Sequence, residues 1–203
     1  MTIVAGMADA VGYITMGGVF AANMTGNTVL AGIDLAAADY VSAWHHLTPL
    51  VSFLAGAMIA RVLLRLLRSP VVGLLVEATL IAGVGFLNIG EESAVMIVAL
   101  AMGIQASSIT AFAGSAISTV VVTSTLARTA DAAVDWLWPG AGAKPPTAAS
   151  ALLMTLTWTG YLAGAVIGAM LVARMTYPLL VPAGLLLVVL LLELTKPRPT
   201  SAA

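Results

Sequence analysis

Five long and uninterrupted apolar runs limit what this sequence can fold into. They cover the ranges Ala43–Leu67, Val71–Asn88, Ala94–Ala113, Ala148–Val172 and Pro178–Leu194. Each run is close to the roughly 20 residues that a helix needs to cross the hydrocarbon core of a bilayer. Continuous apolar runs of this length are typical of membrane helices, whereas half-buried strands alternate apolar and polar residues. The sequence therefore predicts an all-α, polytopic membrane helix bundle that forms a single transmembrane domain over residues 1–203.

The composition agrees with a membrane protein and excludes several other classes. Only 8% of the residues are charged and 61% are hydrophobic, whereas soluble domains carry about 25% charged residues. The net charge of −1 and the lack of a Lys or Arg run argue against binding nucleic acid. The chain has no cysteine, and its two histidines, His45 and His46, are adjacent rather than on one helix face. We therefore expect no metal site and no cofactor.

The first apolar stretch is less regular than the others and predicts a broken helix. It runs over Thr2–Phe20, meets a polar interruption at Asn23–Thr28, and continues to Ile33. The stretch lacks a preceding basic region and contains Asp9, so we expect it to belong to the folded protein rather than to a cleaved signal. The run that starts at Ala94 likewise enters a segment rich in Ser and Thr, Ser115–Thr125, which predicts a second break.

Two parts of the chain resemble each other at a constant offset. Phe53–Ala60 matches Tyr161–Gly168 at an offset of 108, and Gly6 corresponds to Gly103 at an offset of 97. The smaller offset is explained by a Gly- and Pro-rich loop, Pro139–Thr147, in the second copy only. These matches predict two structural repeats, although apolar segments also resemble each other by chance.

The distribution of basic residues favours one topology for repeats over 1–90 and 93–196. With three crossings in each repeat, seven of the eight Lys and Arg residues fall on one side and Arg174 alone on the other. With four crossings they divide equally. Cytoplasmic loops carry the excess of Lys and Arg. We therefore predict about six transmembrane helices as two inverted three-helix repeats, a broken first helix in each repeat, and both termini in the cytoplasm.

Two acids lie inside the predicted crossings. Asp9 is about two turns into the first helix, with Tyr13 one turn further on the same face, and Glu77 is about two turns into the third crossing. An ionisable group in a membrane is costly, by about 2.5 to 3.5 kcal/mol for Asp at a helix centre. We consider both acids as proton-coupling sites or sites for a cationic substrate. The alternative is a hydrogen-bonded acid that only fastens helices together.

The two predicted breaks supply the remaining candidate site residues. A broken membrane helix exposes backbone groups that are tolerated where they line a polar cavity, and paired breaks in two repeats are typical of transporter sites. The predicted substrate-binding residues are Asp9, Tyr13, Asn23, Thr25, Gly26, Asn27, Gln105, Thr123 and Thr125. The alternative is that these Ser, Thr and Asn side chains serve only helix packing.

A repeated stripe of small residues predicts close helix contacts. It consists of Gly160, Gly164 and Gly168 in one copy and Ser52, Gly56 and Ala60 in the other. Such stripes let two helix backbones approach closely. The spacing leaves open whether they pack the two repeats together or form a homodimer.

A family resemblance rests on the N-terminal motifs. The segments Ala5–Ala10 and Gly18–Thr28, with Ala101–Ala106 later in the chain, resemble the YoaK-like family of bacterial inner-membrane proteins of unknown function. The sequence departs from that pattern at Ala106, where Asn is usual, and at Ser124, where Gly is usual. The resemblance implies a small multispanning inner-membrane protein without an established substrate.

These observations lead to a hypothesis of function with two alternatives. We predict a secondary transporter, proton-coupled and specific for an unidentified small molecule or ion, with its site near the middle of the lipid bilayer. A passive channel or facilitator, and a membrane scaffold or lipid-binding protein, remain open. The sequence shows no His–carboxylate pair, Ser–Lys motif or metal-ligand cluster at usable spacing, so we do not expect an enzyme.

Overall fold

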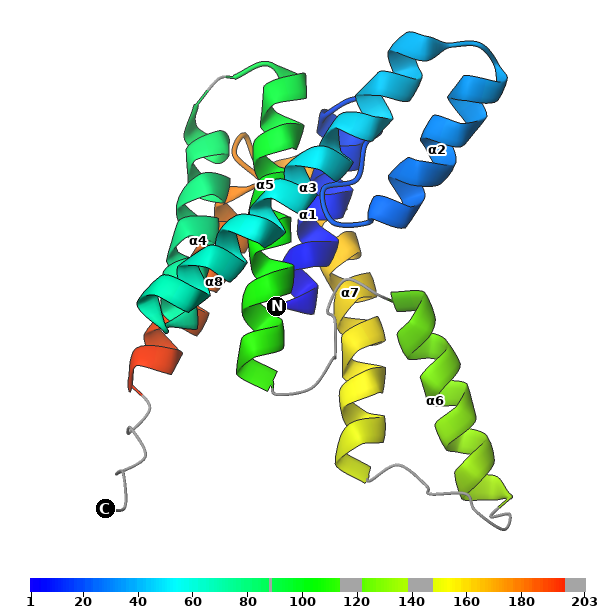
Figure 1. The fold of residues 1–203 in the computed structure, drawn as a ribbon, viewed down its shortest axis with the longest axis vertical. Helices are drawn as coiled ribbons and strands as arrows, with labels where there is room; N and C mark the ends of the chain where they lie inside the picture. Colours follow the sequence, from blue (N-terminus) through cyan, green and yellow to red (C-terminus); the bar gives the residue numbers. More distant parts are fainter. Residues whose placement is uncertain (88, 114–121, 139–147, 196–203) are drawn as a thin grey trace.

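The computed structural model describes residues 1–87, 89–113, 122–138 and 148–195, and within these ranges it is all helical (Figure 1). The helices are α1 (Thr2–Thr15), α2 (Met24–Ala36), α3 (Tyr40–Leu67), α4 (Pro70–Phe86), α5 (Glu91–Ala113), α6 (Val122–Leu137), α7 (Ala148–Arg174) and α8 (Leu180–Thr195). The predicted all-α class is confirmed. Each of the five long apolar runs corresponds to one helix, α3, α4, α5, α7 or α8.

The longest helix, α3, contains a proline without being interrupted. Pro49 has no N–H to donate to the carbonyl of His45, four residues earlier, which would leave that acceptor unpaired. The hydroxyl of Thr48 donates to the same carbonyl at 3.2 Å. The helix therefore continues over 28 residues, or about 42 Å at 1.5 Å per residue.

The first break lies earlier than the sequence indicated. Helix α1 ends at Thr15, and Gly17 and Gly18 follow with φ angles of 73° and 77°, a backbone conformation that glycine adopts at little cost. Helix α2 already begins at Met24, so most of the predicted interruption Asn23–Thr28 is its first turn. In Figure 1, α1 and α2 run in the same direction, so the segment between them leads the chain back from the end of α1 to the start of α2.

The second predicted break is only partly described. Residues 114–121 lie outside the described part of the chain. Helix α6 begins at Val122, inside the predicted polar segment, and continues to Leu137. Helix α6 packs against α7, as α2 packs against α3.

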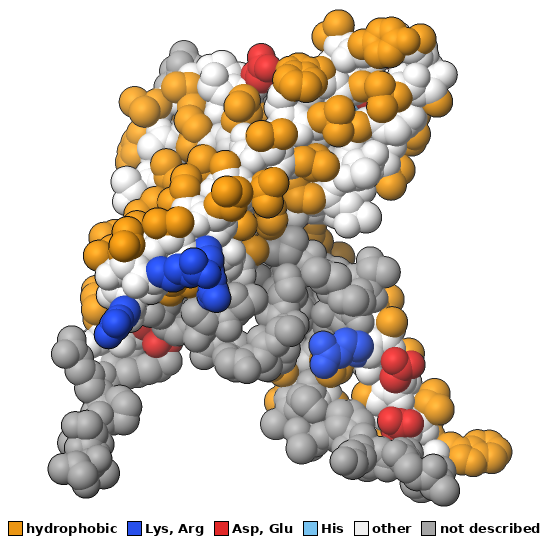
Figure 2. Space-filling view, viewed as in Figure 1, with side chains coloured by type: hydrophobic (Ala, Val, Ile, Leu, Met, Phe, Trp, Pro, Cys, Tyr) orange, Lys and Arg blue, Asp and Glu red, His pale blue; other side chains and the backbone are white. Residues whose placement is uncertain are grey.

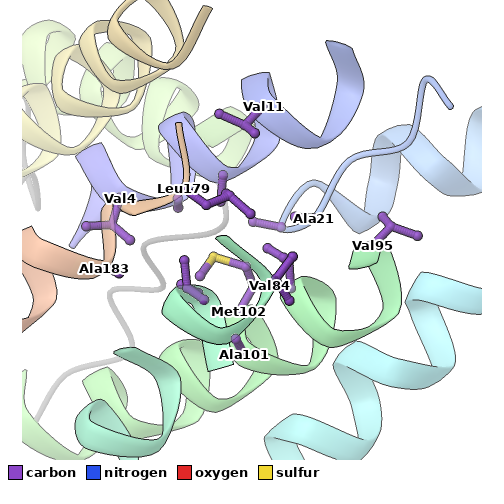
Figure 3. Packing of buried hydrophobic residues seen from close by; sticks show 14 of the residues in the cluster. Val4, Val11, Ala21, Val84, Val95, Ala101, Met102, Leu179 and Ala183 are labelled. Atoms are coloured by element: carbon purple, nitrogen blue, oxygen red, sulfur yellow. The ribbon is translucent and has the colours of Figure 1, made fainter. Parts of the chain in front are cut away.

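The hydrophobic core forms where α1, α4, α5 and the start of α8 meet. Figure 3 shows Val4 and Val11 of α1 around the same space as Val84 of α4 and Met102 of α5. Ala21, from the segment between α1 and α2, also belongs to this cluster. The non-helical segment is therefore held inside the core rather than on the surface.

The long-range packing pairs α1 with α7 and α3 with α5. A Cβ atom on Gly6 would lie 2.1 Å from the carbonyl oxygen of Tyr161, and one on Gly103 would lie 2.0 Å from that of Phe53. These backbones touch because the glycines have no side chain. The two contacts are related by the offsets of 97 and 108 found in the sequence.

The small-residue stripes serve these same contacts. Gly164 of α7 faces the backbone of Ile3, and Gly56 of α3 faces that of Leu100. Both contacts join a helix from residues 1–90 to one from residues 93–196. The stripes are thus occupied within the chain, which leaves these faces unavailable for the homodimer that the sequence left open.

Hydrophobic side chains are spread widely over the described part of the face shown in Figure 2, mainly in its upper half. Large side chains such as Val41, Leu66 and Trp138 are exposed by 83%, 73% and 82%. Among the described residues, Tyr40–Leu67 and Ala151–Arg174 are long and apolar enough to cross a membrane, and only 17% of an apolar 18-residue window in each is buried. Three shorter apolar helices, Thr2–Thr15, Val71–Phe86 and Leu180–Thr195, accompany them.

Candidate functional site

A buried carboxylate, Asp9, joins the break after α1 to helix α7. The side chain of Asp9 is only 3% exposed. Its Oδ1 accepts hydrogen bonds from the backbone N–H groups of Ala22 at 2.5 Å and Asn23 at 3.2 Å, and its Oδ2 accepts one from the hydroxyl of Tyr161. Three donors therefore converge on one carboxyl group, which ties the segment after α1 to helix α7.

The N-terminus of α2 is fixed by two asparagines. The side chain of Asn23 caps the helix by accepting from the N–H of Gly26 at 3.1 Å. The fully buried Asn27 accepts from the N–H of Phe20 at 2.9 Å and donates to the carbonyl of Phe20 at 2.7 Å. Because these bonds satisfy the backbone of the returning segment, the helix starts at Met24 rather than after Thr28.

Two predicted site residues of this region point elsewhere. Tyr13 is 47% exposed and stacks on Phe20 with ring centres 4.9 Å apart. Thr25 is exposed on the first turn of α2. Gly26 lies against the ring of Phe20, where a Cβ atom would come within 2.8 Å. The structure therefore brings together Asp9, Asn23 and Asn27 and leaves Tyr13 and Thr25 at the surface.

Three further buried polar residues lie on the neighbouring helices α4 and α5. Glu77, Gln105 and Ser108 are each 0% exposed. Both carboxylate oxygens of Glu77, both side-chain amide atoms of Gln105 and the hydroxyl of Ser108 have no hydrogen-bond partner within the described part of the chain. We call these three residues the α4–α5 polar cluster.

The register of the two helices places the three residues at neighbouring levels. A Cβ atom on Gly73 of α4 would lie 2.2 Å from the hydroxyl oxygen of Ser108. Helices α4 and α5 run in opposite directions (Figure 1). The residue one turn after Gly73 on α4 is therefore at the same height along the bundle as the residue one turn before Ser108 on α5. These two residues are Glu77 and Gln105.

Thr123 and Thr125 cannot be added to either group. Both lie in the first turn of α6, but their side chains fall outside the described residues. Whether the second half contributes these hydroxyls to a site stays a prediction.

A cleft opens at the end of the bundle where α4 and α5 are connected. Its volume is about 490 Å³, and its lining includes Val11 and Thr15 of α1, Val84 of α4, Glu91 of α5 and Tyr177 before α8. The cleft thus draws its walls from both halves of the chain. It reaches α1 two residues beyond Asp9.

Each of the two histidines contacts a different residue. His46 Nδ1 lies 2.7 Å from Asp34 Oδ2, which links α3 to α2, and Nε2 of His45 lies 2.5 Å from the position of a Cβ atom on Gly17. Within the described ranges, no three His, Cys, Asp or Glu side chains are placed to hold a metal ion together.

Two residues of these clusters were missing from the predicted site. Tyr161 comes 152 positions after Asp9 in the sequence, and Ser108 follows Gln105 by three positions. The repeat alignment already matched Tyr161 with Phe53, so the hydroxyl at one of two equivalent positions was a usable signal. Ser108 lies one turn from Gln105 on the same helix face, which spacing alone would indicate.

Comparison with known proteins defines the family. The family model described as "Protein of unknown function (DUF1275)" matches residues 1–192. The chain belongs to this family. It is also 31% identical over 138 residues to the UPF0700 transmembrane protein YoaK of Bacillus subtilis (strain 168). No solved structure matches the chain.

The extent of the match limits what can be carried over from this relative. The aligned part covers 63% of this chain and 61% of YoaK, less than two thirds of the relative's length. The resemblance to a YoaK-like family is confirmed, and the family match, the transmembrane relative and the apolar outer surface together place this protein in a membrane.

Proposed function

We propose that this protein is a secondary transporter of the bacterial inner membrane that moves a small solute in exchange for, or together with, a proton. The observation that carries the proposal is the Asp9 carboxylate, which is buried among membrane helices and bonded to parts of both repeats. Ala22 and Asn23 belong to the first repeat, whereas Tyr161 belongs to the second.

The hydrogen bonds of Asp9 give the proton a mechanical effect. An ionised carboxylate accepts from all three donors, but a protonated one carries its own O–H and loses part of its acceptor capacity. Protonation therefore weakens the attachment of α7 or of the N-terminus of α2. A proton can shift the balance between two access states only through such a difference in binding.

In our proposal the open cleft is the entrance for the solute, although Asp9 is not among its lining residues. It has walls from both repeats and extends along α1 to Val11, two residues beyond Asp9. In our proposal the solute enters here and is bound near Asp9, Asn23, Gly26 and Asn27. Gln105, Thr123 and Thr125 complete the site from the second repeat, Tyr13 and Thr25 lie at its outer edge, and Glu77 is the second proton-coupling acid.

The proposed transporter has two inverted repeats and about six crossings, with both termini in the cytoplasm. In Figure 1, α1 and α5 run in opposite directions, as do α3 and α7 and also α4 and α8. Figure 2 shows Lys and Arg side chains gathered near the C-terminal end of α3, away from the start of α5. This separation is what the excess of basic residues in cytoplasmic loops requires. In this proposal the protein moves a solute without making or breaking covalent bonds, and we infer that it is not an enzyme.

A solute screen with a proton readout tests the proposal. Purified protein is reconstituted into proteoliposomes that contain a pH-sensitive dye, and small solutes are added one class at a time. We expect at least one solute to induce a proton flux in the unaltered protein and no flux with Asp9→Asn. The exposed Asp39→Asn serves as the matched control and keeps the flux. Full coupled flux in Asp9→Asn would refute the role of this carboxylate.

The other outcomes correspond to the two alternative functions. Solute flux without any pH dependence or counterflow identifies a passive facilitator. No flux with any solute in the folded, unaltered protein identifies a membrane scaffold or lipid-binding protein.

A further inference from the structure

The α4–α5 polar cluster contains buried polar atoms that a bound ligand would pair. Its residues, Glu77, Gln105 and Ser108, are fully buried, and five of their polar atoms lack a partner within the described part of the chain. Each unpaired buried polar group costs about 1 to 3 kcal/mol, and a charge costs more. Helix packing alone would be served better by apolar side chains at these positions.

The chemistry of the cluster selects the kind of ligand. Glu77 offers two carboxylate oxygens, Gln105 one amide oxygen and Ser108 one hydroxyl oxygen, and oxygen donors suit hard cations. A single carboxylate balances one positive charge. The other buried acid among the described residues, Asp9, is already bonded to three donors. A divalent ion would therefore keep an uncompensated charge in an apolar environment, whereas a monovalent ion would not.

The α-amino group at the N-terminus also acts on the cluster. The α-amino group of Met1 interacts electrostatically with Glu77 without forming a hydrogen bond to it. Extending the chain before Met1 moves this charge away, so its contribution can be separated from that of a bound ion.

We propose that Glu77, Gln105 and Ser108 bind a monovalent cation, Na⁺, between α4 and α5. The inference extends the proposed function, which assigns a proton to Asp9 and to Glu77, by giving Glu77 a second ion. A proton and Na⁺ compete for the same carboxylate oxygens. Binding itself requires neither a solute nor transport.

Thermal unfolding in defined salts tests the inference. The detergent-purified full chain is prepared in a choline buffer free of alkali ions, and NaCl is titrated against choline chloride at constant ionic strength. We expect a saturable rise in Tm with Na⁺ only, because an ion that binds the folded state stabilises it. Direct binding of radioactive ²²Na⁺ to the same samples provides a second readout.

Matched variants locate the site. Glu77→Gln keeps the size of the side chain and should abolish both the Tm rise and ²²Na⁺ binding. Ser108→Ala should weaken the apparent affinity by about tenfold, the effect of one lost hydrogen-bonding oxygen on a charge. The exposed Asp39→Asn should bind Na⁺ normally, and a version with two residues added before Met1 should bind it at least as tightly, because the cationic amino group then no longer competes for Glu77. If Glu77→Gln fails to fold, the Ser108→Ala shift still tests the site.

Each result has a clear consequence. The absence of a Tm rise as Na⁺ replaces choline, or ²²Na⁺ binding that survives Glu77→Gln and Ser108→Ala, overturns the inference. Loss of binding on extending Met1 also overturns it, because the site would then depend on the amino group. Na⁺ binding in a protein that shows no solute-induced flux would defeat the proposed transporter and leave the cation site intact. Proton-coupled flux without Na⁺ binding would overturn the cation site and leave the proposed transporter intact.

Discussion

Replacing Gly6 or Gly103 by alanine should separate two helix pairs that now touch through their backbones. The added Cβ atom would lie 2.1 Å from the Tyr161 carbonyl oxygen in one case and 2.0 Å from that of Phe53 in the other. Real Cβ atoms essentially never come within 3.0 Å of a heavy atom of a packed neighbour. Since the obstacle is backbone, each helix pair has to move apart by about 1 Å.

The size of the effect follows from this displacement. A gap of 0.5 to 1 Å forfeits about a quarter to a half of the dispersion energy of the atoms that face it, and overpacking typically costs about 1 to 3 kcal/mol. Alanine gains about 0.5 to 1 kcal/mol over glycine inside a helix, which does not offset the clash. We expect the free energy of unfolding to fall by about 1 to 2 kcal/mol in each variant.

Thermal unfolding of the detergent-purified protein measures this effect. Gly83→Ala and Gly32→Ala are matched controls, because a Cβ atom at either position meets nothing within 4 Å. We expect Tm to fall by several degrees for Gly6→Ala and Gly103→Ala and to stay or rise for the controls. Gly6→Ala should also reduce proton flux more than Gly103→Ala, because it displaces the helix turn that carries Tyr161. Equal stability of all four variants would refute the reasoning.

Three further predictions concern the carboxylate, the break and the topology. Tyr161→Phe removes the hydroxyl donor to Asp9 and should lower the free energy of unfolding by about 1.5 to 3 kcal/mol, whereas Tyr177→Phe, at an exposed position, should not. Asn27→Leu leaves the buried N–H and carbonyl of Phe20 unpaired and should cost about 2 to 4 kcal/mol in chemical denaturation, whereas exposed Thr25→Val should be nearly neutral. Because the chain has no cysteine, Gly142→Cys and Thr176→Cys can be labelled singly in intact cells and inverted vesicles, and labelling of both from one side would contradict the inverted topology.

The helices could be predicted from the sequence, but the details of the breaks could not. The five long apolar runs became helices because continuous apolar segments in a membrane must satisfy their backbone internally. The start of α2 was misplaced because a polar run, Asn23–Thr28, looks like a loop. Its asparagines instead cap the helix and bind the segment before it, and those bonds depend on where Phe20 lies in three dimensions.

The candidate site was predictable in part for a similar reason. Asp9 and Glu77 stand out because a charge inside an apolar run is rare, and both proved to be buried. Tyr13 was assigned to Asp9 from helical spacing, but the hydroxyl that reaches Asp9 comes from Tyr161 on a distant helix. Spacing along one helix indicates which residues share a face and does not indicate which other helix packs against that face.

The crossed pairing of α1 with α7 also constrains how the protein is made. Tyr161 follows Asp9 by 152 residues, which takes roughly 8 to 30 seconds at synthesis rates of about 5 to 20 residues per second. Throughout this interval α1 has no α7 to pack against, and its carboxylate has no hydroxyl donor. The first repeat therefore cannot finish folding as it leaves the ribosome, and it stays in an incomplete state until the second half is inserted.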